Sequence, residues 1–300
     1  MTGESGATGV TGKTGKSGVT GVAGAQGSTA EGIERLSLNQ MTTRGWSLAE
    51  AVRGCAEAGI GGIGVWRDKV EQAGGAVAAA KLVHDAGLTV SSLCRGGFFT
   101  GPGAIEDNRR AIEEAAALGT DTLVLVCGGL PEGSRDLVGA REQVRDALGE
   151  LAPYAGEHGV RLAVEPLHPM FCADRAVVST LAQALDLAEQ FPVEQVGVVV
   201  DSYHVWWDPE LYRQIERAGA RIAAYQVCDW TLPIPADALL GRGHVGDGVI
   251  DFPPLSRAVA AAGYTGWIEV ELFNQEVWDT PGELTLRRMI ERHLEHVALP

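Results

Sequence analysis

Four successive apolar segments in the C-terminal half of the chain each end in a side chain with a carboxylate or amide oxygen. These side chains are Glu165, Asp201, Gln226 and Glu271. Burying several carboxylates close together is unfavourable unless a cation lies among them. An all-oxygen set suits a hard divalent ion such as Mn²⁺ or Mg²⁺ better than Zn²⁺, which prefers Cys and His. We therefore predict a divalent metal site; the alternative is that each acid pairs separately with Lys, Arg or a helix N-terminus.

His168 is the first candidate for proton transfer. It follows Glu165 by three residues and lies between Pro166 and Pro169, which stiffen the turn. The ordinary pKa of an imidazole lies near neutral pH, so a neutral His168 could accept a proton from a carbon close to the metal. We predict that His168 is a catalytic base, with a purely structural core histidine as the alternative.

Five further side chains after predicted strands are candidates for substrate binding: Trp66, Arg95, His204, Arg242 and His244. His204 lies three residues past Asp201, where it could contact substrate or support a metal ligand. Arg242 and His244 belong to a glycine-rich loop that we expect to cover the site, although its glycines also suit a structural turn. Aromatic side chains at this end of the strands suit stacking on sugar or flavonoid-like rings, or ordinary helix packing.

Eight short apolar segments alternate with longer segments of helical spacing. The predicted strands are Ile33–Leu38, Gly62–Trp66, Leu88–Leu93, Thr122–Cys127, Leu162–Glu165, Val196–Asp201, Ile222–Val227 and Trp267–Glu271. Most are continuously apolar, which is typical of strands buried on both faces of a parallel sheet. The predicted helices include Ser47–Ala58, Asn108–Leu118 and Ala140–His158, and Pro153 should kink or restart the last of them.

This order of elements predicts an α/β fold, a single (β/α)8 TIM barrel with its site at the C-terminal ends of the strands. A doubly wound open sheet is the alternative, but no glycine-rich phosphate fingerprint follows the first strand. The chain also contains no G-x-S-x-G elbow, Walker loop or dinucleotide fingerprint, so these motifs do not indicate serine hydrolysis, NTP use or NAD binding.

The ends of the chain and its composition set further limits. Glycine occupies every third position from Gly3 to Gly27 without any proline, so we predict a flexible collagen-like low-complexity tail over residues 1–30 and a barrel domain over residues 31–300.

The formal charge of −15 argues against nucleic acid and membranes as partners. Five cysteines without C-x-x-C spacing, and no signal-peptide pattern, predict a cytoplasmic protein with reduced thiols.

The order Glu, Asp, His or Gln, Glu after strands five to eight resembles the xylose-isomerase-like barrel superfamily of sugar isomerases, sugar 3-epimerases and related endonucleases. The resemblance covers Ile33 to about Val297, and Gln226 stands where the sugar 3-epimerases usually have His. Longer strings resemble the branch that contains the α subunits of bacterial C-glycoside deglycosidases. They include Glu165-Pro166-Leu167-His168-Pro169-Met170, Tyr203-His204-Val205-Trp206-Trp207 and Gly246-Asp247-Gly248-Val249-Ile250-Asp251.

Likeness to this branch implies a divalent metal, a histidine base and a small β subunit. The implied reaction is deprotonation of a 3-oxo-C-glycoside to an enediolate, followed by cleavage of the carbon–carbon bond to the aglycone. We therefore predict a carbon–carbon lyase that works as an oligomer. The alternative is a sugar or sugar phosphate isomerase or epimerase, in which Glu165 and Glu271 would transfer protons from opposite faces of a keto-sugar. A non-catalytic sugar-binding barrel and an apurinic endonuclease are further alternatives, and the acidic charge argues against the endonuclease.

Overall fold

The computed structural model describes residues 32–298, so the predicted tail over residues 1–30 lies outside the described residues. Eight parallel strands close into a barrel in the order β1-β10-β7-β6-β5-β4-β3-β2, which confirms the predicted TIM barrel. The barrel strands are β1 (Leu36–Asn39), β2 (Gly62–Trp66), β3 (Thr89–Gly97), β4 (Thr122–Val126), β5 (Arg161–Glu165), β6 (Val196–Asp201), β7 (Ile222–Val227) and β10 (Ile268–Val270).

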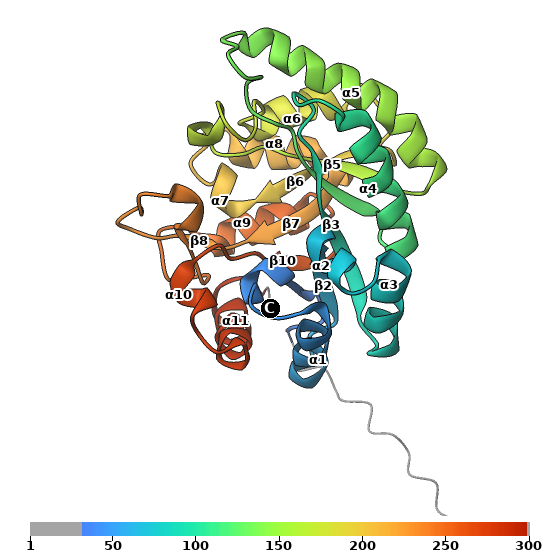
Figure 1. Ribbon diagram of the computed structural model, residues 1–300. Coiled ribbons are helices and arrows are strands. Elements are labelled where there is room, and N and C mark those ends of the chain that lie inside the picture. Colours follow the sequence, from blue (N-terminus) through green and yellow to red (C-terminus); the bar gives the residue numbers. More distant parts are fainter. Residues whose placement is uncertain (1–31, 299–300) are drawn as a thin grey trace, which may run out of the picture.

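Helices surround the barrel on its outer face (Figure 1). They are α1 (Leu48–Ala58), α2 (Arg67–Gln72), α3 (Ala76–Asp85), α4 (Ala104–Leu118), α5 (Leu137–Glu157), α6 (Leu181–Ala188), α7 (Ser202–Val205), α8 (Leu211–Ala218), α9 (Phe252–Ala261), α10 (Gln275–Trp278) and α11 (Gly282–His296). None of the helices within residues 32–298 is long and apolar enough to cross a membrane.

All eight predicted strands are present, and the bounds of β2, β6 and β7 are those predicted. The capping box of α1 also forms, because Ser47 Oγ accepts the Glu50 N–H while the Glu50 carboxylate accepts the Ser47 N–H. The helix was predicted to kink or restart at Pro153, and the restart is wrong: α5 runs through the proline from Leu137 to Glu157. Pro153 is exposed, so water can take the place of the hydrogen bond that its missing N–H leaves unmade at the Gly149 carbonyl.

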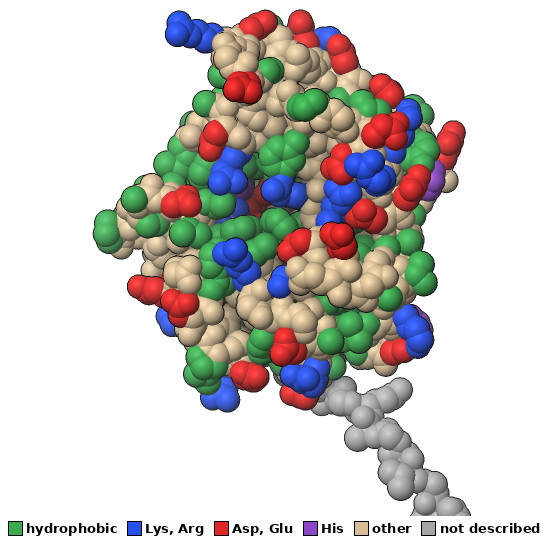
Figure 2. All heavy atoms as spheres, in the orientation of Figure 1, with side chains coloured by type: hydrophobic (Ala, Val, Ile, Leu, Met, Phe, Trp, Pro, Cys, Tyr) green, Lys and Arg blue, Asp and Glu red, His purple; other side chains and the backbone are tan. Residues whose placement is uncertain are grey.

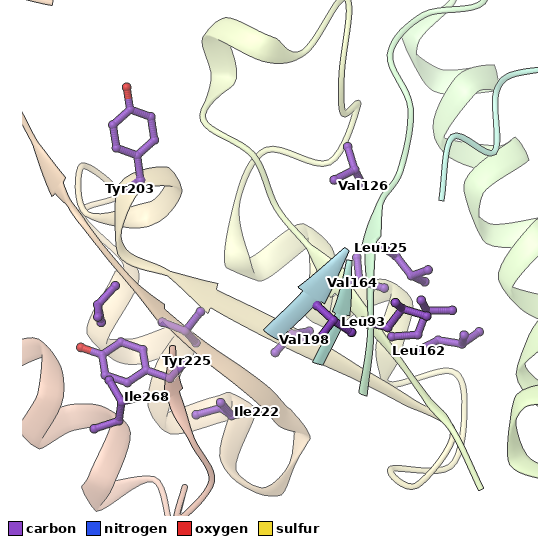
Figure 3. Packing of buried hydrophobic residues seen from close by; sticks show 14 of the residues in the cluster. Leu93, Leu125, Val126, Leu162, Val164, Val198, Tyr203, Ile222, Tyr225 and Ile268 are labelled. Carbon is purple, nitrogen blue, oxygen red and sulfur yellow. The ribbon is translucent and has the colours of Figure 1, made fainter. Parts of the chain in front are cut away.

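The buried apolar side chains form two clusters, one inside the barrel and one between the barrel and its helices. A small cluster from five successive strands fills the inside: Cys94, Val124, Ala163, Val199 and Ala224. The much larger cluster lies between the strands and the helices, and it includes Leu93, Leu125 and Leu162 on neighbouring strands (Figure 3). Because successive residues of a strand face opposite sides, Ala163 and Glu165 both face inward. The same alternation brings Asp201, two residues after Val199, to the inside of the barrel mouth.

A short antiparallel hairpin extends the loop after β7. Its two strands are β8 (Asp229–Trp230) and β9 (Arg242–Gly243), and neither was predicted. Two-residue strands show no periodicity that could reveal them. The Asp229 carboxylate anchors the following loop, because Oδ2 accepts the backbone N–H groups of Gly246 and Gly248 and Oδ1 accepts that of Ile250. This hairpin positions the side chain of Arg242.

Candidate active site

Three buried carboxylates meet at the C-terminal end of the barrel. Glu165 is the last residue of β5, Asp201 is the last residue of β6, and Glu271 directly follows β10. Each of these residues is at most 5% exposed. Asp201 also begins α7, where its Oδ1 accepts the Tyr203 N–H at 2.8 Å. Its other carboxylate oxygen remains available to the site.

The Arg242 guanidinium lies among these carboxylates. Its Nη1 lies 3.1 Å from Asp201 Oδ2 and 2.8 Å from Glu271 Oε2. The guanidinium also packs on two aromatic rings, with Cζ 4.8 Å from the ring centre of Tyr203 and 4.9 Å from that of Phe273. Arg242 was predicted to bind substrate from a covering loop, and the structure places it in the centre of the acidic set.

His204 connects the carboxylates to the loop after β5. Its Nε2 lies 3.9 Å from Glu165 Oε1 and 3.8 Å from Asp201 Oδ2, and ligand atoms of these three residues lie within 4.8 Å of one another. Its Nδ1 accepts the backbone N–H of His168 at 3.1 Å. Its Nε2 lies 3.0 Å from Arg242 Nη2, and a guanidinium can only donate, so each ring nitrogen of His204 faces an N–H donor. His204 is thus held between Arg242 and the backbone of His168, next to the carboxylates of the site.

Gln226 lies beside Asp201 in the register of β6 and β7. Its Nε2 donates a 3.0 Å hydrogen bond to Glu269 Oε1, which fixes the orientation of the amide. Its Oε1 is buried and has no hydrogen-bond partner within residues 32–298. A buried, unpaired amide oxygen next to carboxylates fits a place in the coordination of a hard cation. The residues present thus fit a divalent metal held by oxygens.

Glu269 forms a second polar layer deeper in the barrel. Its carboxylate accepts hydrogen bonds from Asn39 Nδ2 at 2.7 Å, Ser91 Oγ at 2.6 Å and Ser92 Oγ at 2.8 Å. Only glycine fits at position 64, since a Cβ there would come within 2.5 Å of the Glu269 carboxylate. This layer was not predicted from the sequence, although Glu269 and Glu271 are two residues apart and alternation along an extended segment places both on the same side of the sheet.

Burial dominates the electrostatics of the acidic set. It raises the pKa of Glu165 well above its usual value, and the neighbouring Asp201 and Glu271 charges raise it further. Burial also raises the pKa of Asp201, and it raises that of Glu271 to about 7 even though Arg242 acts to lower both. Among the described residues, Arg242 provides the guanidinium that forms ion pairs with these carboxylates, so full ionisation of all three leaves more negative charge than those ion pairs balance. A divalent cation would balance this charge.

His168 lies at the rim of the site. Its ring packs against Trp230 and Trp207, with ring centres 4.9 and 5.4 Å apart. The ring is half-buried and burial lowers its pKa, which favours the neutral form. Nδ1 accepts the Met170 N–H at 3.3 Å. The backbone of His168 thus touches the site through His204, while its ring is not among the described residues that line the two cavities of the mouth.

Two cavities open from the site towards solvent. The inner one, about 110 Å³, is lined by Glu165, His204, Arg242 and Glu271, and the outer one is about 980 Å³. Both are also lined by Trp66 and Arg95. Figure 2 shows a hollow near the centre of one face, with Lys, Arg and hydrophobic side chains around it. The outer cavity is much larger than the inner one, and aromatic side chains line part of its wall.

His244 does not join this group. It is 5% exposed and is not among the described residues that line either cavity of the mouth. Burial lowers its pKa to about 4, so the ring is neutral at physiological pH. Of the residues predicted to bind substrate, the structure therefore places Trp66, Arg95, His204 and Arg242 at the mouth and leaves His244 in the loop that supports them.

Two curated relatives share part of their length with this chain. A 3-dehydroshikimate dehydratase of Pseudomonas putida is 27% identical over 246 residues, which are 76% of this chain and 36% of that protein. An inosose isomerase of Bacillus licheniformis is 30% identical over 157 residues, which are 51% of this chain and 54% of that protein. The matched segments thus span about a third to a half of the length of these relatives.

Solved structures and a family model cover most of the barrel. Protein SMc04130 of Sinorhizobium meliloti 1021 is 46% identical, with a TM-score of 0.85 over 89% of this chain and 100% of that chain. The IolI protein with a bound zinc atom is 22% identical, with a TM-score of 0.75 over 87% of this chain and 97% of that chain, a likeness of fold alone. A family model described as xylose isomerase-like TIM barrel matches residues 52–296. The chain therefore belongs to the xylose isomerase-like TIM barrel family.

Proposed function

We propose that the chain is a divalent-metal-dependent enzyme that removes a proton from the carbon next to the ketone of a cyclic keto-sugar. The observation that carries this proposal is the set of three buried carboxylates, of which two form ion pairs with the single guanidinium of Arg242, beside the unpaired Oε1 of Gln226. A structural cluster of this charge would be unfavourable without a cation. The names of the two curated relatives, a dehydratase and an isomerase, support a sugar-like ketone as substrate.

Glu165, Asp201, Gln226 and Glu271 would hold the metal. When bound, a divalent ion would act as a Lewis acid that makes the C–H next to a carbonyl more acidic. The zinc atom of the IolI structure supports a divalent ion in general. The all-oxygen ligand set favours Mn²⁺ or Mg²⁺ for this chain.

The other side chains of the inner cavity would orient the substrate. Arg242 presents a buried Nε–H without a hydrogen-bond partner among the described residues, so it can donate a hydrogen bond to a substrate oxygen. His204 lines the same cavity and would contact the substrate through its ring. Arg242 also holds Asp201 and Glu271 in place through its two ion pairs. The apolar faces of Trp66 and Phe273 would exclude water from the reacting carbon.

We propose elimination as the fate of the deprotonated sugar, and specifically the cleavage of the carbon–carbon bond of a 3-oxo-C-glycoside. The aglycone carbon would take up a proton as this bond breaks, and an unsaturated 3-oxo-sugar would remain. The base would be His168, whose ring is neutral and would have to turn from Trp230 into the cavity. The outer cavity, lined by Trp66, Phe98 and Trp278, supports an aromatic aglycone. A small β subunit and an oligomeric state belong to this proposal, and the five unpaired cysteines support a cytoplasmic location.

The second candidate is isomerisation or epimerisation of a keto-sugar. It is favoured by the raised pKa values of Glu165 and Glu271, which suit carboxyl groups that both accept and return a proton near neutral pH. The name of the inosose isomerase supports it as well. In this reaction His168 would only position His204.

Deuterium exchange tests the shared first step. The full chain, loaded with Mn²⁺ or treated with EDTA, is incubated in D₂O with a 3-oxo-C-glucoside, an inosose and ketohexoses, with and without a candidate β subunit. We expect deuterium at the carbon next to the ketone only in the metal-loaded samples. Released aglycone indicates elimination, and an isomerised sugar indicates the second candidate. The proposal is wrong if metal-loaded protein exchanges no proton of any of these ketones.

A further inference from the structure

Two arginines other than Arg242 line the inner cavity. Arg95 comes from the end of β3, and Arg175 comes from the segment between β5 and α6. Within residues 32–298, the Arg95 guanidinium forms neither a hydrogen bond nor an ion pair, although the side chain is half-buried. Arg175 lies 3.8 Å from Asp174, whose side chain is 65% exposed, so this pair is weak. The inner cavity thus contains two guanidinium groups without a strong partner.

The backbone of β3 is shaped so that Arg95 faces the mouth. The pairing of β3 with β4 shifts register between Cys94 and Gly96, which makes Arg95 the extra residue of a β-bulge. Gly97 has a φ of +103°, and a Cβ there would collide with the carbonyl group of Val126. Bulges near functional sites commonly redirect one side chain.

The aromatic neighbours of Arg95 leave its hydrogen-bonding edge free. Its Cζ lies 4.2 Å from the ring centre of Phe98 and 5.8 Å from that of Trp66. A guanidinium that packs by its face on an aromatic ring can still donate two parallel N–H groups from its edge. Such a fork matches the two oxygens of a carboxylate or two oxygens of a phosphate.

With a divalent ion bound in the site, the positive charges of Arg95 and Arg175 exceed those that the three carboxylates balance. Arg242 and a divalent ion together balance the charges of Glu165, Asp201 and Glu271. The outer cavity is lined by three acidic residues, but also by four basic ones, Arg44, Arg67, Lys69 and Arg95, so basic side chains outnumber acidic ones in both cavities. On a chain with a formal charge of −15, such a local surplus attracts anions to this mouth.

We infer that the substrate carries an anionic group, a carboxylate or a phosphate, which Arg95 and Arg175 bind where the two cavities join. This inference rests on the proposed function, because it assigns a class to the same substrate: an acidic keto-sugar or 3-oxo-glycoside. The reacting ketone would then lie near Glu165 and Glu271, with the anionic group towards the outer cavity.

Binding measurements test this inference without any turnover. Metal-loaded full chain is titrated in a calorimeter with glucose, glucuronate and glucose 6-phosphate. We expect one of the acidic sugars to bind at least about tenfold more tightly than glucose, since bidentate charge-assisted hydrogen bonds are about twice as strong as neutral ones. A preference for glucuronate identifies a carboxylate, and a preference for glucose 6-phosphate identifies a phosphate. Equal affinity for all three sugars would overturn the inference.

Variants connect that preference to the two arginines. Arg95→Gln should lose most of the tenfold preference while metal content stays unchanged, and Arg95→Lys should keep part of the preference. Arg213→Gln is the matched control, because it removes the same charge from an exposed pair with Glu210. A preference that survives in both Arg95→Gln and Arg175→Gln would also contradict the inference. Proton exchange is measured separately, so a failure of the proposed reaction remains distinguishable from a failure of anion binding.

Discussion

Glu271 combines a buried charge, an ion pair with Arg242 and a proposed metal ligand. Replacing it by Gln keeps the shape of the side chain but removes one of the three negative charges that attract the cation. We expect E271Q to bind Mn²⁺ at least about tenfold more weakly than the wild type and to lose measurable proton exchange. Metal analysis of the purified protein and calorimetry measure the first effect. The exposed Glu276→Gln variant is the control, and normal metal content in E271Q would contradict the assignment.

His168 distinguishes the two candidate reactions. If its ring is the base, His168→Ala should keep the metal and reduce turnover of a 3-oxo-C-glycoside by about 10²–10⁴-fold, the usual effect of losing a general base. The His204 interaction should survive, because it uses the backbone N–H of residue 168. Metal content and steady-state rates are the measurements. Near-normal turnover would remove His168 from the chemistry and leave proton transfer to Glu165 and Glu271.

At the scale of single residues, sequence could identify which strand ends carry oxygens, but not how those oxygens are arranged. The acids at 165, 201 and 271 were predicted from strand positions alone, and the structure brings them together. The central place of Arg242 was not predicted, because it depends on a hairpin of two-residue strands. The depth of Gln226 and Glu269 was also hidden, since the register between neighbouring strands decides it and a continuous apolar run does not reveal register.

The loop after β8 and β9 depends on one buried carboxylate. Asp229 accepts hydrogen bonds from three backbone N–H groups of the segment 246–250. Asp229→Ala would leave these donors unpaired, so we expect the free energy of unfolding to fall by about 2–4 kcal/mol. Urea unfolding of the metal-free protein measures this change. Asp237→Asn, at an exposed turn of the same hairpin loop, should change stability by less than about 0.5 kcal/mol.

Helix α5 contains a proline, Pro153, although the helix continues on both sides of it. Pro153 is exposed and lies near the C-terminal end of the 21-residue helix, where it removes the hydrogen bond to the Gly149 carbonyl. Pro153→Ala should restore that bond, and we expect the free energy of unfolding to rise by about 1–3 kcal/mol. Thermal and urea unfolding measure the difference. A variant no more stable than the wild type would mean that the local backbone had already adapted to the proline.

At the scale of elements, prediction succeeded where burial on both faces gives strands a continuous apolar pattern. It placed the eight barrel strands, and its errors lie at their ends. The strand β3 extends to Gly97 rather than Leu93, because the bulge at Arg95 preserves pairing with β4 beyond the apolar run. A bulge leaves no signal in hydrophobic periodicity, so sequence could not show that Arg95 belongs to the strand.

At the scale of the whole molecule, the closed barrel concentrates charge that the sequence distributes over 100 residues. Glu165 and Asp201 end β5 and β6, Glu271 follows β10, and the pairing of β10 with β7 places these strand ends side by side on the curved sheet. Burial is the main cause of the raised pKa of each acid, and neighbouring carboxylates raise the pKa of Glu165 and Glu271 further. Because these three acids are buried together and have raised pKa values, the stability of the folded protein depends on pH and on bound cations.

This coupling predicts how metal and pH act together on stability. Burial raises the pKa of Glu271 to about 7, above its usual value of 4.5, so the folded metal-free protein holds a proton that the unfolded chain releases. The resulting stabilisation is complete below pH 4.5 and is lost as the pH rises through 7. A divalent cation replaces the proton, and it competes with protons less as the pH rises. We therefore expect the increase in Tm caused by Mn²⁺, relative to EDTA, to be small at about pH 5 and larger at about pH 8.

Differential scanning fluorimetry at one-unit pH steps measures this dependence. The E271Q variant is the matched control, because its amide cannot titrate, and its metal-induced Tm change should be small and vary less with pH. The same increase in Tm at every pH in the wild type would mean that the cation does not displace protons from these carboxyl groups. The metal would then bind elsewhere, and the charge argument for a cation at the barrel mouth would fail.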